Sequence, residues 1–429
     1  MKKALLSIAS VAAVVAFADM SVTGVSVAQD ESKCVTVDYT LSGGPAIVTV
    51  DFLTNGVSVG EKNFANIGGD VNMVVKNGAR KIFWRPDRDW GGNVATECTL
   101  TANVTAWDLK SPPNYMVIDG RILMPKKNVR FYVSADALPE GGLENRSLYA
   151  GMYIVFRKIP AKNVRWRMGS TAAQRTAIGY TNTAYEEREI PHYVTLTNDY
   201  YLGIYPLTQR QSRSYWGAPR NMVGYDRDVW ECLPANNIAY SEIRGSSLGA
   251  QWPTETAWHN VDSGSLLAAL RERTGIPTID LPTMARWEFA YRAGQGTLFY
   301  NGSEAVTEQM TSAESPYAWY SGNSSAIQPV GLLAPNPWGL YDMAGNVHEL
   351  CLDWFWQKWY NSPNGSEATE PAGPELNQYT TTRVARGGAR SASLLDMRAS
   401  SCSMIDPSNY KGEIGLRLCC EVDMAVLAE

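Results

Sequence analysis

Histidine and closely spaced cysteine pairs are scarce in this chain of 429 residues. It has only three histidines, and its seven cysteines include no Cys-x-x-Cys pair. Structural zinc sites need such ligands at short spacing, so the sequence predicts no zinc site. Long runs of one charge are also missing, because 38 basic and 43 acidic residues are spread along the chain to give a net charge of −5. We therefore expect no nucleic-acid partner.

Aromatic residues, glycine and proline are abundant. The chain has 14 Trp, 22 Tyr, 36 Gly and 22 Pro. This mixture favours loops and short strands over long helices. The length is too great for a single ordinary core, so we expect two domains.

The first residues have the pattern of a secretory signal peptide. Lys2 and Lys3 precede an apolar stretch over residues 4–15, and Ala16-Phe17-Ala18 forms a small-x-small cleavage site. A membrane anchor is the alternative, but the apolar run is short for a span and no charged stop follows. We expect residues 1–18 to be removed, leaving no membrane span. The mature protein is then secreted or periplasmic.

Residues 19–112 read as an all-β domain. Short runs of alternating apolar and polar residues are separated by Gly, Asn and Pro turns at roughly ten-residue spacing. This pattern predicts a sandwich of immunoglobulin-like type. Residues 113–160 follow a break in the pattern at the pair Pro112-Pro113 and contain further strand material. We therefore treat them as a connector whose strands can belong to either neighbour.

The remaining residues, 161–423, show little regular secondary structure. Helices are predicted over 265–275, where Leu266, Leu267 and Leu270 share one side, and over 284–294. Gly275 and Gly294 are the expected C-terminal stops.

Export makes the cysteines candidates for disulfides. Cys34 and Cys98 lie near the two ends of the first domain, and a disulfide between them could hold these ends together. Five cysteines follow in the second region, an odd number, so one can stay free. Of these we single out Cys351 and Cys402, and the pairing stays open.

Four blocks of the second region, at 167–208, 281–294, 335–355 and 383–402, together resemble the formylglycine-generating enzyme family, or sulfatase-modifying factor domains. The third, "PNPWGLYDMAGNVHELCLDWF", is the most specific, and "IGLRLCC" closes the series. The resemblance covers about 260 residues in family order. It implies an α+β, C-type-lectin-like fold with low regular secondary structure, and it implies less about activity.

The resemblance bears directly on copper. In the oxidase members, two cysteines after the Arg-Gly-Gly turn bind copper(I), which prefers soft thiolate ligands. The matching positions here are Ala392 and Met397, so we expect no copper. Cys402 matches a cysteine that has a disulfide role in some members. Formylglycine-generating oxidase activity is therefore not expected.

The resemblance also implies a calcium site in the third block. Two carboxylates and two backbone carbonyls are hard oxygen donors of the kind that calcium takes. The alternative is a tight loop held by hydrogen bonds without an ion. The matching positions are Asp342, Gly345, Val347 and Glu349.

A groove around residues 386–402 is the expected functional surface. Its candidate residues are Arg386, Gly387, Gly388, Ser391 and Arg398. We expect a non-oxidase binding or structural member of the family, whose ligand is an exported protein, a peptide or a glycan. The alternative is an enzyme, either a divergent formylglycine-generating oxidoreductase or one with another chemistry, acting on an exported protein.

Overall fold

A computed structural model describes most of the chain. The described residues are 19–90, 99–179, 187–217, 232–247, 249–252, 260–312, 315–359, 367–375, 381–410 and 412–429. The predicted signal peptide, residues 1–18, and Cys98 lie outside them. No helix in the described part of the chain is both long enough and apolar enough to cross a membrane.

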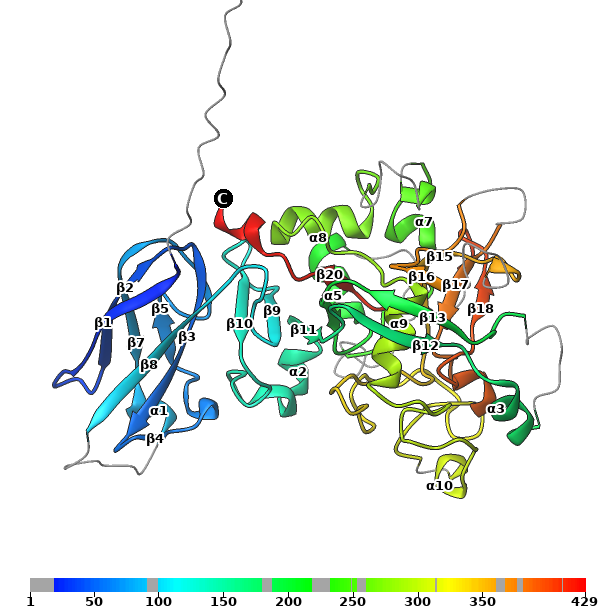
Figure 1. Cartoon of the computed structure of the whole chain (residues 1–429), viewed down its shortest axis with the longest axis horizontal. Helices are drawn as coiled ribbons and strands as arrows, with labels where there is room; N and C mark the ends of the chain where they lie inside the picture. Colours follow the sequence, from blue (N-terminus) through cyan, green and yellow to red (C-terminus); the bar gives the residue numbers. More distant parts are fainter. Residues whose placement is uncertain are drawn as a thin grey trace, which may run out of the picture.

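The N-terminal part is a sandwich of two antiparallel sheets, which confirms the all-β prediction (Figure 1). One sheet has the order β1 (Ser21–Gln29), β2 (Val35–Ser42), β7 (Gly78–Trp84), β5 (Ile67–Gly69). The other has β4 (Val57–Ser58), β3 (Ala46–Thr54) and β6 (Met73–Val75), with β8 (Leu100–Trp107) also paired to β3. Short helices η1 (Glu61–Asn63) and α1 (Pro86–Asp89) join strands.

The core of the sandwich follows from alternation along its strands. In β2, every second side chain from Val35 to Leu41 is buried. Trp84 is 1% exposed and stacks on Phe52 with ring centroids 4.4 Å apart. Alternation of this kind puts one face of each strand against the opposite sheet.

The strands of the connector belong to the sheet of the second domain. β9 (Tyr115–Asp119), β10 (Val129–Tyr132) and β11 (Tyr153–Ile159) pair with β14 (Tyr200–Gly203) and β20 (Cys419–Glu421) in the order β10-β9-β11-β14-β20. Short helices η2 (Gly142–Glu144) and α2 (Arg146–Tyr149) lie between β10 and β11. The largest described sheet therefore combines strands from both ends of this region of the chain.

The two parts pack against each other through apolar side chains. Ile47 of β3 is fully buried in the same cluster as Phe131 of β10. The Phe131 backbone N–H donates to Asn72 O at 2.8 Å, and Met424 N–H donates to Leu109 O at 2.9 Å. The C-terminal segment, ending in η6 (Ala425–Ala428), runs back toward the sandwich (Figure 1).

The second part mixes small sheets with short helices, which confirms the α+β class. One sheet has the order β12 (Val164–Met168), β13 (His192–Leu196), β16 (Glu367–Thr369). The other has β18 (Ser403–Ile405), β17 (Arg383–Arg386), β15 (His348–Trp354), β19 (Ile414–Leu416). The helices are α3 (Ala172–Ala177), α5 (Gln209–Trp216), α7 (Tyr240–Ile243), η3 (Gly249–Gln251), α8 (Leu266–Thr274), α9 (Met284–Arg292), α10 (Glu308–Thr311) and η5 (Leu394–Met397).

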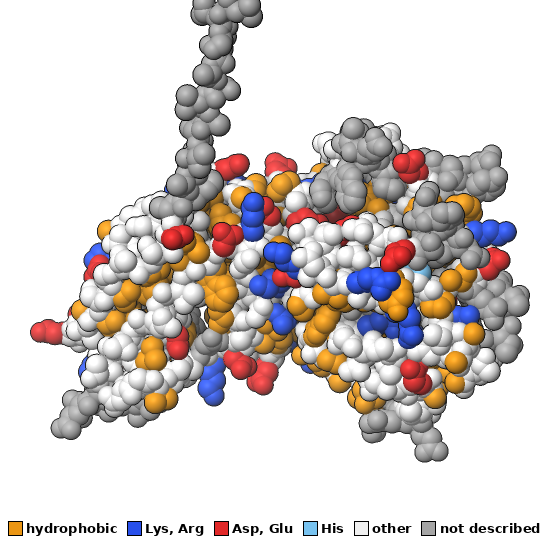
Figure 2. All heavy atoms as spheres, viewed as in Figure 1, with side chains coloured by type: hydrophobic (Ala, Val, Ile, Leu, Met, Phe, Trp, Pro, Cys, Tyr) orange, Lys and Arg blue, Asp and Glu red, His pale blue; other side chains and the backbone are white. Residues whose placement is uncertain are grey.

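Both helices that the sequence predicts are present. In α8, Ser265 caps the N-terminus by accepting from Ala268 N–H, and Gly275 ends the helix in the left-handed conformation. In α9, Thr283 is the N-cap, and the helix ends at the left-handed Ala293, which is followed by the expected Gly294 with φ 85°. The face of the molecule in Figure 2 carries acidic and basic side chains interspersed with apolar ones.

Candidate functional site

The Arg-Gly-Gly turn leaves strand β17 through two left-handed residues. Gly387 has φ 85° and Gly388 has φ 70°. A Cβ on Gly388 would lie 2.9 Å from Met397 Cγ, and one on Gly387 would lie 3.1 Å from Met343 O. Side chains at these positions are excluded by both backbone conformation and space. The turn fixes where the following loop leaves the sheet.

The loop after the turn forms one wall of an open groove of about 480 Å³. In this wall, the Arg390 guanidinium pairs with Glu413 at 2.7 Å, and Ser391 Oγ donates to the same carboxylate. The residues lining the groove are Asn236, Ser325, Ala326, Ile327, His348, Arg390, Ser391, Ile405, Gly412 and Glu413.

Of the five predicted groove residues, only Ser391 lines the groove, whereas Arg386, Gly387, Gly388 and Arg398 are buried. Arg398 is fully buried and binds both oxygens of Glu189 at 2.8 Å. Arg386 is 1% exposed and pairs with Glu288 at 2.9 Å. Neither side chain lines the groove. Arg386 and Arg398 lie in the core because buried guanidinium groups need carboxylate partners, and distant parts of the chain supply these carboxylates.

Glu288 joins this buried network to helix α9. Burial by itself raises the pKa of the Glu288 carboxyl, but the guanidinium groups of Arg292 and Arg386 outweigh it and the pKa is lowered. Glu288 also accepts a hydrogen bond from Gly169 N–H at 2.9 Å. The network therefore fixes the base of the Arg-Gly-Gly turn to the domain core.

Ala392 and Met397 do not form a polar or thiol site. Met397 is fully buried, its carbonyl accepts from Tyr291 OH at 2.6 Å, and its side chain lines a cavity of about 10 Å³ with Phe299 and Tyr300. Ala392 is half-buried against the same core. No cysteine lines the open groove in the described part of the chain.

The cysteines of the described residues are all free thiols. Cys351 and Cys402 are buried, and burial raises the pKa of both. The expected disulfides involving Cys351 and Cys402 are therefore not formed. Cys34 is also free, and its proposed partner Cys98 lies outside the described residues.

The carboxylate of Glu349, one of the predicted calcium ligands, is already bound by donors of the protein itself. Glu349 is 1% exposed, binds Arg417 through both oxygens at 2.7 and 2.9 Å, and also accepts from Trp287 Nε1 at 2.6 Å. Asp342 Oδ2 accepts from Gly331 N–H at 2.7 Å. A cation here would have to displace a buried guanidinium. The described residues contain no group of three or more His, Cys, Asp or Glu placed to hold a metal.

Sequence reasoning found Ser391 but missed the charged pair beside it. Glu413 lies 22 residues after Ser391, outside the predicted 386–402 segment. Arg390 is next to Ser391, and its neighbours carry no pattern that distinguishes it from the buried arginines. Asn236 comes from a distant loop. Only the folded arrangement brings these residues to one groove.

Comparison with known proteins gives the family. The model for the sulfatase-modifying factor enzyme 1-like domain matches residues 165–422. The serine/threonine-protein kinase pkn1 of Chlamydia pneumoniae is 31% identical over 137 residues, covering 32% of this chain and 20% of the kinase. The formylglycine-generating enzyme of Thermomonospora curvata is 32% identical over 120 residues, covering 25% of this chain and 37% of the enzyme.

The chain thus spans about a fifth of the kinase and about a third of the enzyme. Among solved structures, Treponema denticola variable protein 1 has a TM-score of 0.46 and 21% identity, with 63% of this chain and 96% of that chain covered. Because the family model matches more than half of the residues, the chain belongs to the sulfatase-modifying factor enzyme 1-like domain family.

Proposed function

We propose that this protein is an exported, non-oxidase member of the family that binds a protein, peptide or glycan through the groove beside Arg390, Ser391 and Glu413. The N-terminal sandwich serves as a spacer that presents the domain. Export is supported by the signal-peptide pattern of residues 1–18.

The observation that carries the proposal is the chemistry of the groove. Its volume of about 480 Å³ lies in the range of ligand sites. Ile327 and Ile405 give it apolar surface, and the Arg390–Glu413 pair supplies both signs of charge. Such a mixture suits recognition, because apolar area supplies affinity and a few polar groups orient the ligand.

The absence of oxidase activity follows from the two positions that match the copper ligands. Copper(I) needs soft ligands, and Ala392 has none. Met397 has a thioether, but it faces aromatic rings in the core. The thiol of Cys402 has a raised pKa, because burial favours its neutral form. A neutral, buried thiol is a poor substitute for a thiolate pair.

The proposal is tested by screening the purified protein against peptide and glycan arrays, with Glu413→Ala and Arg390→Ala as groove variants. Ligands that bind the wild type are expected to be lost in both. Arg165→Ala is the matched control, since Arg165 also forms an exposed ion pair, with Glu367 at 2.8 Å, on another sheet. Ligands that bind all variants equally would place recognition elsewhere, and turnover of an array peptide would favour an enzyme.

A further inference from the structure

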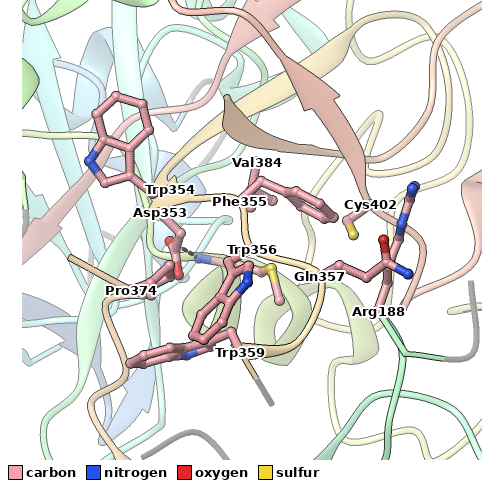
Figure 3. Close-up of a pocket in the computed structure, with 12 residues that line it drawn as sticks. Arg188, Asp353, Trp354, Phe355, Trp356, Gln357, Trp359, Pro374, Val384 and Cys402 are labelled. Atoms are coloured by element: carbon pink, nitrogen blue, oxygen red, sulfur yellow. Dashed lines mark hydrogen bonds between the residues drawn. The ribbon is translucent and has the colours of Figure 1, made fainter. Parts of the chain in front are cut away.

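A second hollow lies at the opposite end of strand β15 from the groove. His348, at the start of β15, lines the groove, and Asp353, near its end, lines this second hollow. At a strand rise of about 3.3 Å per residue, these positions are roughly 16 Å apart. Figure 3 shows the hollow with aromatic side chains around Asp353. It is therefore a site separate from the groove.

Asp353 has a buried carboxylate, and one of its two oxygens accepts no hydrogen bond from the described residues. The residue is 1% exposed, and its Oδ2 accepts from Met284 N–H at 2.7 Å. Its Oδ1 is buried, and no residue in the described ranges hydrogen-bonds to it. Buried carboxylate oxygens are costly unless a donor or a cation faces them. The hollow thus contains an acceptor that calls for a positively charged or hydrogen-bonding group.

A glycine keeps space beside this oxygen. Gly373 has φ 77°, and a Cβ built on it would lie 2.9 Å from Asp353 Cβ and 3.2 Å from Asp353 Oδ1. Any side chain at this position would therefore press on the carboxylate. The neighbouring Pro374 also lines the hollow.

Tryptophan rings supply the rest of the wall near Asp353. The rings of Trp356 and Trp359 have centroids 6.4 Å apart and are tilted by 48°. The faces of such rings carry negative potential and attract cations. Arg188 also lines the hollow, but its guanidinium lies over Phe355, 5.2 Å from the ring centroid, and Figure 3 places it on the far side from Asp353. The end that holds Asp353 therefore favours a cation.

The size of the hollow limits that cation. Its volume of about 20 Å³ accommodates one water-sized group. A primary ammonium has that size, whereas a quaternary ammonium or a planar guanidinium is larger. We propose that this hollow binds a primary ammonium group on an unbranched alkyl chain, as in a lysine side chain. The ammonium fills the hollow with Asp353 as its counter-ion, and the alkyl stem leaves it along the half-buried rings of Trp356 and Trp359.

The test is isothermal titration calorimetry of the full chain with two probes, Nα-acetyl-lysine N-methylamide and n-butylammonium. Both carry the group, so binding of either supports the site, and tighter binding of the first assigns it to protein lysines. Asp353→Asn keeps an oxygen for Met284 N–H and removes the charge. It is expected to weaken binding at least about tenfold.

Asp342→Asn is the matched control, because Asp342 is also a buried aspartate with a backbone N–H partner but lies outside this hollow. This variant is expected to bind the probes as the wild type does. The Nε-acetylated form of the lysine probe is expected not to bind. Equal binding by wild type and Asp353→Asn, equal binding of the acetylated probe, or no heat with either amine would overturn the proposal. Circular dichroism of each variant establishes that it is folded.

Discussion

Arg390 and Glu413 form an ion pair of 2.7 Å between two loops, and Ser391 donates to the same carboxylate. The three residues give the groove a polar wall beside the Arg-Gly-Gly turn. Their side chains remain in contact with solvent, with Arg390 30% and Glu413 21% exposed. This exposure separates them from the buried ion pairs beneath.

We expect replacement of this pair to change binding more than folding. Exposed ion pairs contribute about 0–1 kcal/mol to the free energy of unfolding, so Glu413→Ala should lower stability by no more than about 1 kcal/mol. Urea denaturation measures this directly. A loss several times larger would mean that Glu413 is a structural residue, and the groove variants could not then report on ligand recognition.

For the buried pair of Arg398 and Glu189, we expect replacement of one partner to cause a large loss of stability. Removing one partner leaves an uncompensated charge in the core, so Arg398→Ala should destabilise the domain by about 3–5 kcal/mol. Arg165→Ala, which breaks an exposed pair, should cost less than about 1 kcal/mol. The two variants are compared by urea denaturation under the same conditions. Similar small losses would contradict a structural role for Arg398.

The contrast between these arginines shows which features of the fold can be predicted from local sequence and which cannot. Local signals predicted helices α8 and α9 and the alternating strands of the sandwich, because each depends on neighbours in the chain. The positions of Arg386 and Arg398 depend on Glu288 and Glu189, which are 98 and 209 residues away. Nothing in the local sequence distinguishes these buried arginines from Arg390 in the groove. Cys351 and Cys402, the disulfide candidates of the second region, are free thiols, whereas the Cys34–Cys98 pairing stays a prediction because Cys98 lies outside the described residues.

Calcium should have no effect on stability. Because Arg417 and Trp287 already satisfy both oxygens of Glu349, neither calcium nor a chelator should move the melting temperature measured by scanning calorimetry. Glu349→Ala should lower the melting temperature by the same amount with and without calcium, because it leaves the buried Arg417 guanidinium without its carboxylate partner. A calcium-dependent rise that Glu349→Ala abolishes would restore the calcium site.

Asp353 makes stability depend on pH. Burial raises the pKa of its carboxyl from 3.8 to about 6, against the lowering effects of the Met284 and Asp353 backbone N–H groups and of Arg386 and Arg383. Between these two pH values the folded state holds a proton that the unfolded state has lost. The contribution of Asp353 to the free energy of unfolding therefore falls as the pH rises from 3.8 to about 6. Other titratable or charged side chains lining the same hollow are Arg188 and Cys402.

The expected consequence is that Asp353→Asn stabilises the protein above pH 6 but not at pH 4. The gain should be on the order of 1–3 kcal/mol, given about 1.4 kcal/mol for each pKa unit. Urea denaturation of both proteins across this pH range gives the difference, in which other titrating groups cancel. A difference that does not change with pH would show that the Asp353 carboxyl titrates normally in the folded state.

In our proposal, the groove beside the Arg-Gly-Gly turn is a binding surface and not a copper centre. Anaerobic copper(I) titration against a competing chelator, followed by oxygen uptake with a cysteine-containing peptide, tests it most directly. We expect copper well below one equivalent per chain and no oxygen uptake, because Ala392 and Met397 offer no thiolate pair. Tight one-to-one copper binding with oxygen consumption would contradict it.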